Sequence, residues 1–130
     1  MLLVKTYIGT STILNAGIGC FAAEFIPKGT KIWELNPILD RIYSDYNISK
    51  MTDIEAEFVK IYAYKHNALY FLCVDNARFF NHSDTNFNTI DPNDEYATYA
   101  ARDIQVGEEI ISNYLSFGTT EDDKNFNSHL

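Results

Sequence analysis

Short apolar runs rich in β-branched and aromatic residues, separated by turn residues, dominate the chain. Runs of this length and composition are typical of β-strands. They cover residues 2–8, 20–25, 31–35, 69–74, 96–101 and 109–114. Turn residues at 27–29 and 106–108, each including a glycine, separate neighbouring runs. The pattern predicts a mostly β domain of many short strands rather than an alternation of strands and helices.

One segment, residues 52–65, has the three- and four-residue spacing of apolar positions that is typical of a helix. The recurring positions are Ile54, Phe58, Ile61, Tyr62 and Lys65. Thr52 and Glu55 stand three residues apart at its start, as in a capping box. We therefore expect one main helix in this segment.

The chain has 130 residues, of which 46% are hydrophobic, and it contains no internal repeat or low-complexity linker. This length suits one domain with one modest core. We expect that domain to cover residues 1–118, with an insert at about 36–70, and a polar, acidic tail to cover 119–130. No run approaches the roughly 20 apolar residues of a membrane span, and the first residues lack a basic leader. We therefore expect no membrane contact and a cytoplasmic, or at least intracellular, protein.

Acidic residues outnumber basic ones by 18 to 10, which gives a net charge of −8. Nine acidic and two basic residues fall in 91–130, so this stretch alone carries −7. A nucleic-acid backbone is a poor partner for such a charge, whereas a basic protein is a suitable one. The two cysteines, Cys20 and Cys73, are too few for a disulfide framework and have no histidine at ligand spacing. We expect reduced thiols and no metal site.

Three segments have the residue types of a binding or catalytic site. The segment GIG at 17–19 precedes a predicted strand, where glycines let a ligand approach the backbone. The segment RFFNHS at 78–83 ends in polar side chains, and the segment GEEIISNY at 107–114 ends on a tyrosine. Each alone is more often structural: a glycine turn, a group of turn-forming residues with a buried histidine, or a core aromatic residue.

Together, in this order and spacing, the three segments resemble the motif set of SET-domain protein lysine methyltransferases. The likeness extends from about residue 16 to residue 117 and includes the block CFAAEFIPKGTKIWE at 20–34. Within the family, the chain is most similar to the minimal stand-alone SET proteins of bacteria and large viruses. The resemblance implies a β-clip fold of short curved sheets with a C-terminal pseudoknot, in which the 81–82 segment threads a loop closed by the last block.

The resemblance also implies that S-adenosylmethionine is the cofactor and that the methyl acceptor is a lysine in a basic protein, such as a histone tail. The cofactor-binding residues that it implies are Gly17, Ile18, Gly19, Cys20, Arg78, Phe80, Asn81, His82, Tyr114 and Phe126. Tyr114 matches the catalytic tyrosine of the family, and Phe126 is expected to stack on the adenine. The residues expected to line the channel for the substrate lysine are Tyr62, Ser112 and Phe117. Direct displacement of a methyl group from a sulfonium requires alignment and no metal.

Departures from the family pattern leave other functions open. Leu35 stands where many relatives have a tyrosine, and residues 84–88 lack the proline of the family's third block. A non-catalytic SET module that binds a protein is therefore the alternative to a methyltransferase. A hydrolase built on His82 with Asp84 or Asp75 is a further alternative, but no nucleophile stands at a recognisable spacing. Similar minimal enzymes associate in pairs, so we also expect a homodimer.

Overall fold

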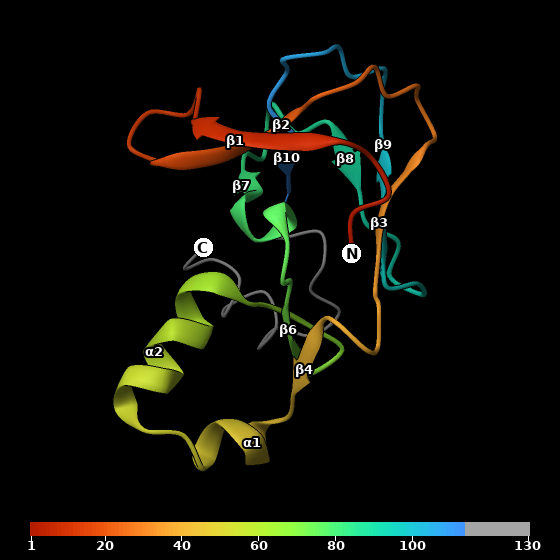
Figure 1. The fold of residues 1–130 in the computed structure, drawn as a ribbon. Helices are drawn as coiled ribbons and strands as arrows, with labels where there is room; N and C mark the ends of the chain where they lie inside the picture. Colours follow the sequence, from red (N-terminus) through yellow and green to blue (C-terminus); the bar gives the residue numbers. More distant parts are fainter. Residues whose placement is uncertain (114–130) are drawn as a thin grey trace.

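The computed structural model describes residues 1–113, in which short strands are interrupted by helices (Figure 1). The strands are β1 (Thr6–Thr10), β2 (Ile18–Ala22), β3 (Lys31–Glu34), β4 (Arg41–Tyr43), β5 (Tyr64–His66), β6 (Leu69–Leu72), β7 (Asn81–His82), β8 (Thr89–Ile90), β9 (Ala97–Ala100) and β10 (Ile111–Ser112). The helices are α1 (Asp45–Ser49), α2 (Asp53–Tyr62) and the 3₁₀ helix η1 (Asn76–Phe79). The expected mostly β architecture is confirmed.

The strands of residues 1–113 are distributed over several small sheets. β1 and β2 form an antiparallel hairpin, β3, β9 and β8 form a second sheet, and β4, β6 and β5 form a third. β7 and β10 form a parallel pair in which Asn81 lies opposite Ile111 and His82 lies opposite Ser112. In Figure 1 the hairpin and the two helices α1 and α2 lie at opposite ends of the molecule. The β7–β10 pair brings together two segments that are far apart in the chain. The expected pseudoknot includes residues beyond 113 and so falls partly outside the described residues.

The strand boundaries differ from the prediction where pairing, rather than composition, decides them. Three predicted runs correspond to β3, β6 and β9; β3 and β6 begin as predicted but end earlier, and β9 is one residue shorter at each end. β1 extends to Thr10 because Thr10 still pairs with Ile18 before a hydrogen bond between Ser11 and Gly17 closes the loop. The strands β4, β5, β7 and β8 and the helix α1 were not predicted, because elements this short carry too little periodicity.

The capping box predicted at the start of α2 is confirmed. Thr52 Oγ1 accepts a hydrogen bond from the Glu55 backbone N–H at 3.3 Å, and the Glu55 carboxylate accepts one from the Thr52 N–H at 2.8 Å. The predicted end at residue 65 is wrong. α2 ends at Tyr62 because residues 64–66 form β5 and pair with β6.

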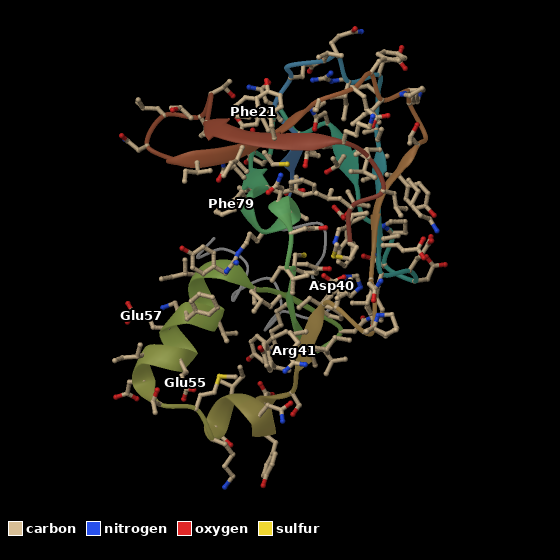
Figure 2. All side chains as sticks on the ribbon, in the orientation of Figure 1. Phe21, Asp40, Arg41, Glu55, Glu57 and Phe79 are labelled. Atoms are coloured by element: carbon tan, nitrogen blue, oxygen red, sulfur yellow. The ribbon has the colours of Figure 1, made fainter. Side chains whose placement is uncertain are left out.

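The apolar positions whose spacing predicted α2 do not mark its buried face. Ile54, Phe58 and Ile61 are 81%, 42% and 56% exposed, whereas Val59 is 4% exposed. Val59 packs in a small hydrophobic cluster with β6. The helix therefore contacts the domain through a narrow face, and Glu57 on its outer side points away from the sheets (Figure 2).

A larger hydrophobic cluster joins β2, β3 and β9 to η1. Trp33 is its largest fully buried side chain. Cys20 and Cys73 are free thiols buried in the same cluster. Burial raises the pKa of both thiols, that of Cys20 to about 12. Both cysteines are therefore unreactive core residues at neutral pH.

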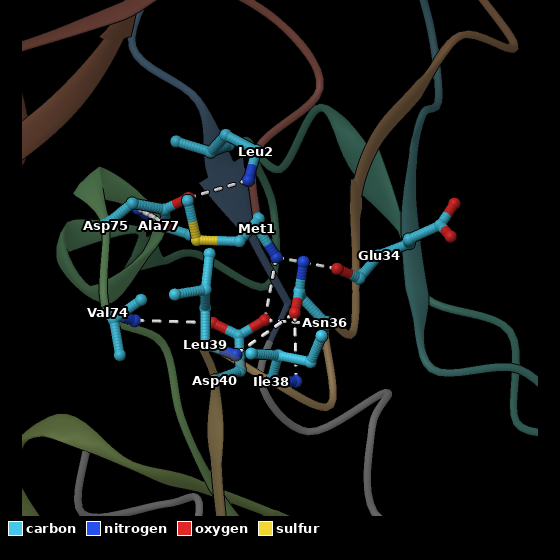
Figure 3. Close-up of polar contacts among 10 residues, drawn as sticks. All are labelled: Met1, Leu2, Glu34, Asn36, Ile38, Leu39, Asp40, Val74, Asp75 and Ala77. Atoms are coloured by element: carbon cyan, nitrogen blue, oxygen red, sulfur yellow. Dashed lines mark hydrogen bonds and ion pairs between the residues drawn. The ribbon is translucent and has the colours of Figure 1, made fainter.

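Asp40 connects the segment after β3 to the start of the chain through hydrogen bonds. Its carboxylate is 5% exposed and accepts a hydrogen bond from the Met1 ammonium at 2.7 Å (Figure 3). It also accepts hydrogen bonds from the backbone N–H groups of Asn36 at 2.9 Å and Val74 at 3.4 Å. The buried charge is thus satisfied by an opposite charge and by backbone donors.

Asp75 sets the start of η1 in a similar way. Its carboxylate accepts hydrogen bonds from the Ala77 N–H at 3.1 Å and from the Leu2 N–H at 2.7 Å (Figure 3). The first is an N-cap contact of the 3₁₀ helix. Asp75 therefore fixes the start of the helix that leads into β7.

None of the helices in residues 1–113 has the length and apolar character that a bilayer span requires.

Candidate functional site

The loop between β1 and β2 depends on Gly17. Its φ of +76° lies in the left-handed region that favours glycine. Its carbonyl accepts a hydrogen bond from the Ser11 N–H at 2.8 Å. The neighbouring carbonyl, that of Ile18, accepts one from the Asn81 side-chain amide at 3.0 Å. The GIG and RFFNHS segments therefore lie side by side.

Gly19 is needed for a different reason, because a side chain has no room there. A Cβ at this position would lie 2.9 Å from Cδ of Glu109 and 3.3 Å from Nδ2 of Asn81. The Glu109 carboxylate and the Asn81 amide occupy the space that a side chain at Gly19 would need. All three sequence segments thus meet at Gly19.

Glu109 is the centre of this meeting point, and no function was predicted for it. It is 5% exposed and accepts hydrogen bonds from Ser11 Oγ at 2.8 Å, from the Thr12 N–H at 2.7 Å and from Thr12 Oγ1 at 2.6 Å. Asn81 Nδ2 donates a further one at 3.1 Å. In the sequence, nothing distinguishes Glu109 from the preceding Glu108, which instead pairs with Arg102.

The environment of Glu109 keeps its carboxylate ionised. Burial alone would raise its pKa, but the hydrogen bonds from Thr12, Asn81 and Ser11 outweigh burial. The pKa of Glu109 therefore lies below its usual value.

Arg78 lies at the end of η1 among aromatic rings. Its guanidinium is 4.7 Å from the ring centroid of Tyr62, 5.6 Å from that of Phe58 and 5.8 Å from that of Phe79. These are cation–π distances. Arg78 forms no salt bridge within residues 1–113, and its Nε is buried without a hydrogen-bond partner there. The positively charged guanidinium of Arg78 therefore packs against aromatic rings and has no carboxylate partner among the described residues.

Two cavities lie on either side of Arg78. We call the larger one, of about 280 Å³, the outer cavity, and its lining includes Ala16, Ile18, Tyr62, Arg78, Phe80 and Asn81. We call the smaller one, of about 50 Å³, the inner cavity, and its lining includes Trp33, Tyr62, Tyr64, Arg78, Thr98 and Ser112. They share Ile61, Tyr62, Arg78 and Phe80. The two cavities therefore adjoin at a wall built from α2 and the η1–β7 segment.

A buried carboxyl group lies behind the inner cavity. Thr98, which lines the cavity, donates a hydrogen bond from Oγ1 to Asp91 Oδ1. The other oxygen of Asp91 has no hydrogen-bond partner in the described part of the chain. Burial raises the pKa of Asp91 to about 7, although the Thr98 hydrogen bond acts in the opposite direction. The charge beside this cavity therefore changes near neutral pH.

Six of the ten predicted site residues that fall in residues 1–113 line one or both of these cavities. Ile18, the first residue of β2, lines the outer cavity, and the residues of the second segment that line it are Arg78, Phe80 and Asn81. Tyr62 lines both cavities, and Ser112 lines the inner one.

Four predicted cofactor residues of the described chain, Gly17, Gly19, Cys20 and His82, lie outside the two linings. Cys20 has its side chain in the core, and its carbonyl accepts a hydrogen bond from the Ile110 N–H at 2.8 Å. His82 is half-buried in β7 and lies opposite Ser112. Tyr114, Phe117 and Phe126 lie outside the described residues. No group of three or more metal-ligating side chains occurs in residues 1–113.

Residues 17–115 match the SET domain as a protein family. The chain belongs to the SET-domain family. The match covers all three segments that meet at Gly19, so the fold described above is a SET fold. No curated protein matches the chain in sequence.

Solved structures show the same fold. A Plasmodium falciparum protein described as a candidate histone methyltransferase is similar with a TM-score of 0.59 and 23% identity, over 87% of this chain and 95% of that one. The S-adenosylmethionine-bound, autoinhibited polycomb repressive complex 2 of Chaetomium thermophilum is similar with a TM-score of 0.64 and 23% identity. That match covers 88% of this chain and 16% of the other. The SET domain here thus spans about a sixth of the length of the polycomb chain.

Proposed function

We propose that the protein transfers a methyl group from S-adenosylmethionine to the side-chain amine of a lysine in a basic protein. The observation that carries the proposal is the pair of cavities in a SET domain that share the wall of Tyr62, Arg78 and Phe80. Methyl transfer needs two ligands in separate sites whose reacting atoms meet in line. The outer cavity suits the cofactor, and the inner cavity suits the end of a lysine side chain.

The residues at the outer cavity fit this cofactor. Arg78 offers a guanidinium with no carboxylate partner in residues 1–113, and a carboxylate such as that of the methionine moiety would pair with it. Asn81 lines the same cavity and adds a polar side chain there, held against the Ile18 carbonyl. When bound, S-adenosylmethionine supplies a methyl group on a positively charged sulfonium.

The inner cavity favours the neutral form of a lysine amine. Its volume is about 50 Å³. Its walls include the rings of Trp33, Tyr62 and Tyr64, and Arg78 adds a positive charge. Low polarity and a neighbouring positive charge both lower the pKa of an amine, so a lysine would enter with a free lone pair.

The remaining functional residues follow from the resemblance and the chain order. Tyr114 is two residues beyond Ser112, which lines the inner cavity, and this supports its assignment as the catalytic tyrosine. We keep Phe117 as a channel wall and Phe126 as the residue that stacks on the adenine. The SET domain would cover residues 1–118 and the tail 119–130, as in the minimal stand-alone type.

The charge of the protein supports a basic substrate. The net charge is −8, and α2, which lines both cavities, carries exposed acidic side chains. Glu55 and Glu57 lie on its outer side (Figure 2). Such a field increases the association rate of a lysine-rich segment and weakens with salt. The substrate would be a histone tail or another lysine-rich protein, the free thiols suit an intracellular location, and a homodimer would complete the peptide site.

Titration calorimetry with S-adenosylmethionine, followed by a methylation assay on lysine-rich proteins, tests this function. We expect the wild-type protein to bind the cofactor and to methylate lysine. The variant Tyr114→Phe should bind the cofactor within a few-fold of wild type and lose methyl transfer. Absence of cofactor binding by the wild type would instead favour the non-catalytic protein-binding module.

A further inference from the structure

We propose that Glu109 is a positioning residue that orients the Asn81 side chain and holds the β1–β2 loop against the outer cavity. The inference rests on the proposed function, because the outer cavity is taken as the cofactor site. Glu109 itself does not line that cavity. Its effect on the cofactor would therefore pass through Asn81 and the loop.

The contacts of Glu109 come from segments that are far apart in the chain. Ser11 and Thr12 belong to the loop after β1, and Asn81 belongs to β7. Glu109 lies just before β10 and forms an isolated bridge with Phe21 of β2. One carboxylate thus joins the hairpin, β7 and the start of β10. Without it, the loop and β7 would lose their common partner.

The orientation of the Asn81 amide follows from these contacts. Nδ2 carries two hydrogens, and the structure gives it two acceptors, the Ile18 carbonyl at 3.0 Å and Glu109 Oε2 at 3.1 Å. Oδ1 of Asn81 is therefore the polar atom left for a ligand in the outer cavity. It can accept a hydrogen bond from an N–H or O–H group of the cofactor. A rotated amide would present a donor instead.

The site requires an ionised carboxylate and cannot use an amide in its place. All the contacts of Glu109 with Ser11, Thr12 and Asn81 are made with donors. A glutamine would place its own NH₂ group against at least one of them and leave a partly buried donor unpaired. The hydrogen bonds that lower the pKa of Glu109 show the same preference for the charged form. The absence of a side chain at Gly19 is consistent with this arrangement, because a Cβ there would displace the Glu109 carboxylate.

The test compares Glu109→Gln with Glu108→Gln. Both variants remove one negative charge at adjacent positions, but Glu108 bonds to Arg102 and to the Gln105 N–H, away from Asn81. We expect Glu109→Gln to raise the Kd for S-adenosylmethionine, measured by calorimetry, at least tenfold, with Glu108→Gln within twofold of wild type. The KM for the cofactor should rise in parallel, while kcat at saturating cofactor stays within about threefold. Equal Kd values for the two variants would overturn the proposal.

A second readout does not depend on activity. In ¹⁵N-correlated NMR spectra, the Asn81 NH₂ signal, identified by its loss in Asn81→Asp, should shift and exchange faster in Glu109→Gln and stay unchanged in Glu108→Gln. If Glu109→Gln does not fold, Thr12→Val removes only the hydroxyl donor at 2.6 Å from an exposed loop residue. Its cofactor Kd should rise several-fold, and an unchanged Kd would contradict the proposal. A wild-type protein that binds no cofactor refutes the proposed function, whereas the NMR comparison still tests the Glu109–Asn81 contact.

Discussion

Replacing Asp91 with asparagine should remove a pH dependence of stability that comes from one buried carboxyl group. Asp91 is 9% exposed, and one of its oxygens has no hydrogen-bond partner in residues 1–113. Burial raises its pKa from the ordinary value of 3.8 to about 7. Asparagine keeps an oxygen that can accept the Thr98 hydrogen bond, but it has no charge to bury.

The sign and size of the effect follow from proton linkage. Between pH 3.8 and about 7 the unfolded chain has lost the Asp91 proton while the folded protein retains it. The folded protein then binds more protons, so the free energy of unfolding falls as the pH rises. Each pH unit below the folded pKa is worth about 1.4 kcal/mol, so the loss from pH 5 to pH 8 approaches about 3 kcal/mol. By about pH 8, one unit above the folded pKa, both states are largely ionised and the loss is nearly complete.

Urea unfolding between pH 5 and pH 8 measures this difference. Glu109, whose pKa lies below its usual value, stays ionised over this range and contributes no slope. The stability of Asp91→Asn minus that of wild type should grow by about 3 kcal/mol from pH 5 to pH 8. Asp94→Asn, an exposed residue of the same loop, is the control for the change of net charge. A difference that stays constant with pH would show that Asp91 is already ionised in the folded protein at pH 5.

Three further predictions concern packing. Val59→Ala should lower the unfolding free energy by about 1–2 kcal/mol, whereas Ile54→Ala, at an 81% exposed position, should change it by less than about 0.5 kcal/mol in the same denaturation experiment. Cys20 and Cys73 should react with a thiol reagent only at the rate of unfolding, since burial raises the pKa of both; rapid labelling of the native protein would contradict this. Gly19→Ala should destabilise the protein and weaken cofactor binding, because its Cβ would lie 2.9 Å from Glu109 Cδ; unchanged binding by calorimetry would refute the role of this close approach.

Local signals in the sequence were sufficient for several elements. The Thr52–Glu55 capping box predicted the start of α2, because both of its hydrogen bonds form within four residues. Apolar runs predicted β3, β6 and β9 in the same way. The resemblance predicted which segments would meet, and the hydrogen bond of Asn81 to Ile18 together with the β7–β10 pairing shows that meeting.

Features that depend on tertiary contacts were not predictable. The spacing of Ile54, Phe58 and Ile61 identified the helix but not its buried face, because the sheet that packs against α2 selects Val59. Glu109 carried no local sign of its role, since its partners lie up to 98 residues away in sequence. Short strands such as β7 form only when a distant partner such as β10 is in place.

The most direct test of the central claim is the transfer of label from methyl-labelled S-adenosylmethionine to protein in a cell extract. Mass spectrometry identifies the modified residues, and Tyr114→Phe serves as the inactive control. The account predicts methyl groups on lysine side chains of basic proteins, present with wild type and absent with Tyr114→Phe. No label transfer by a wild-type protein that binds the cofactor, or equal transfer by wild type and Tyr114→Phe, would contradict it.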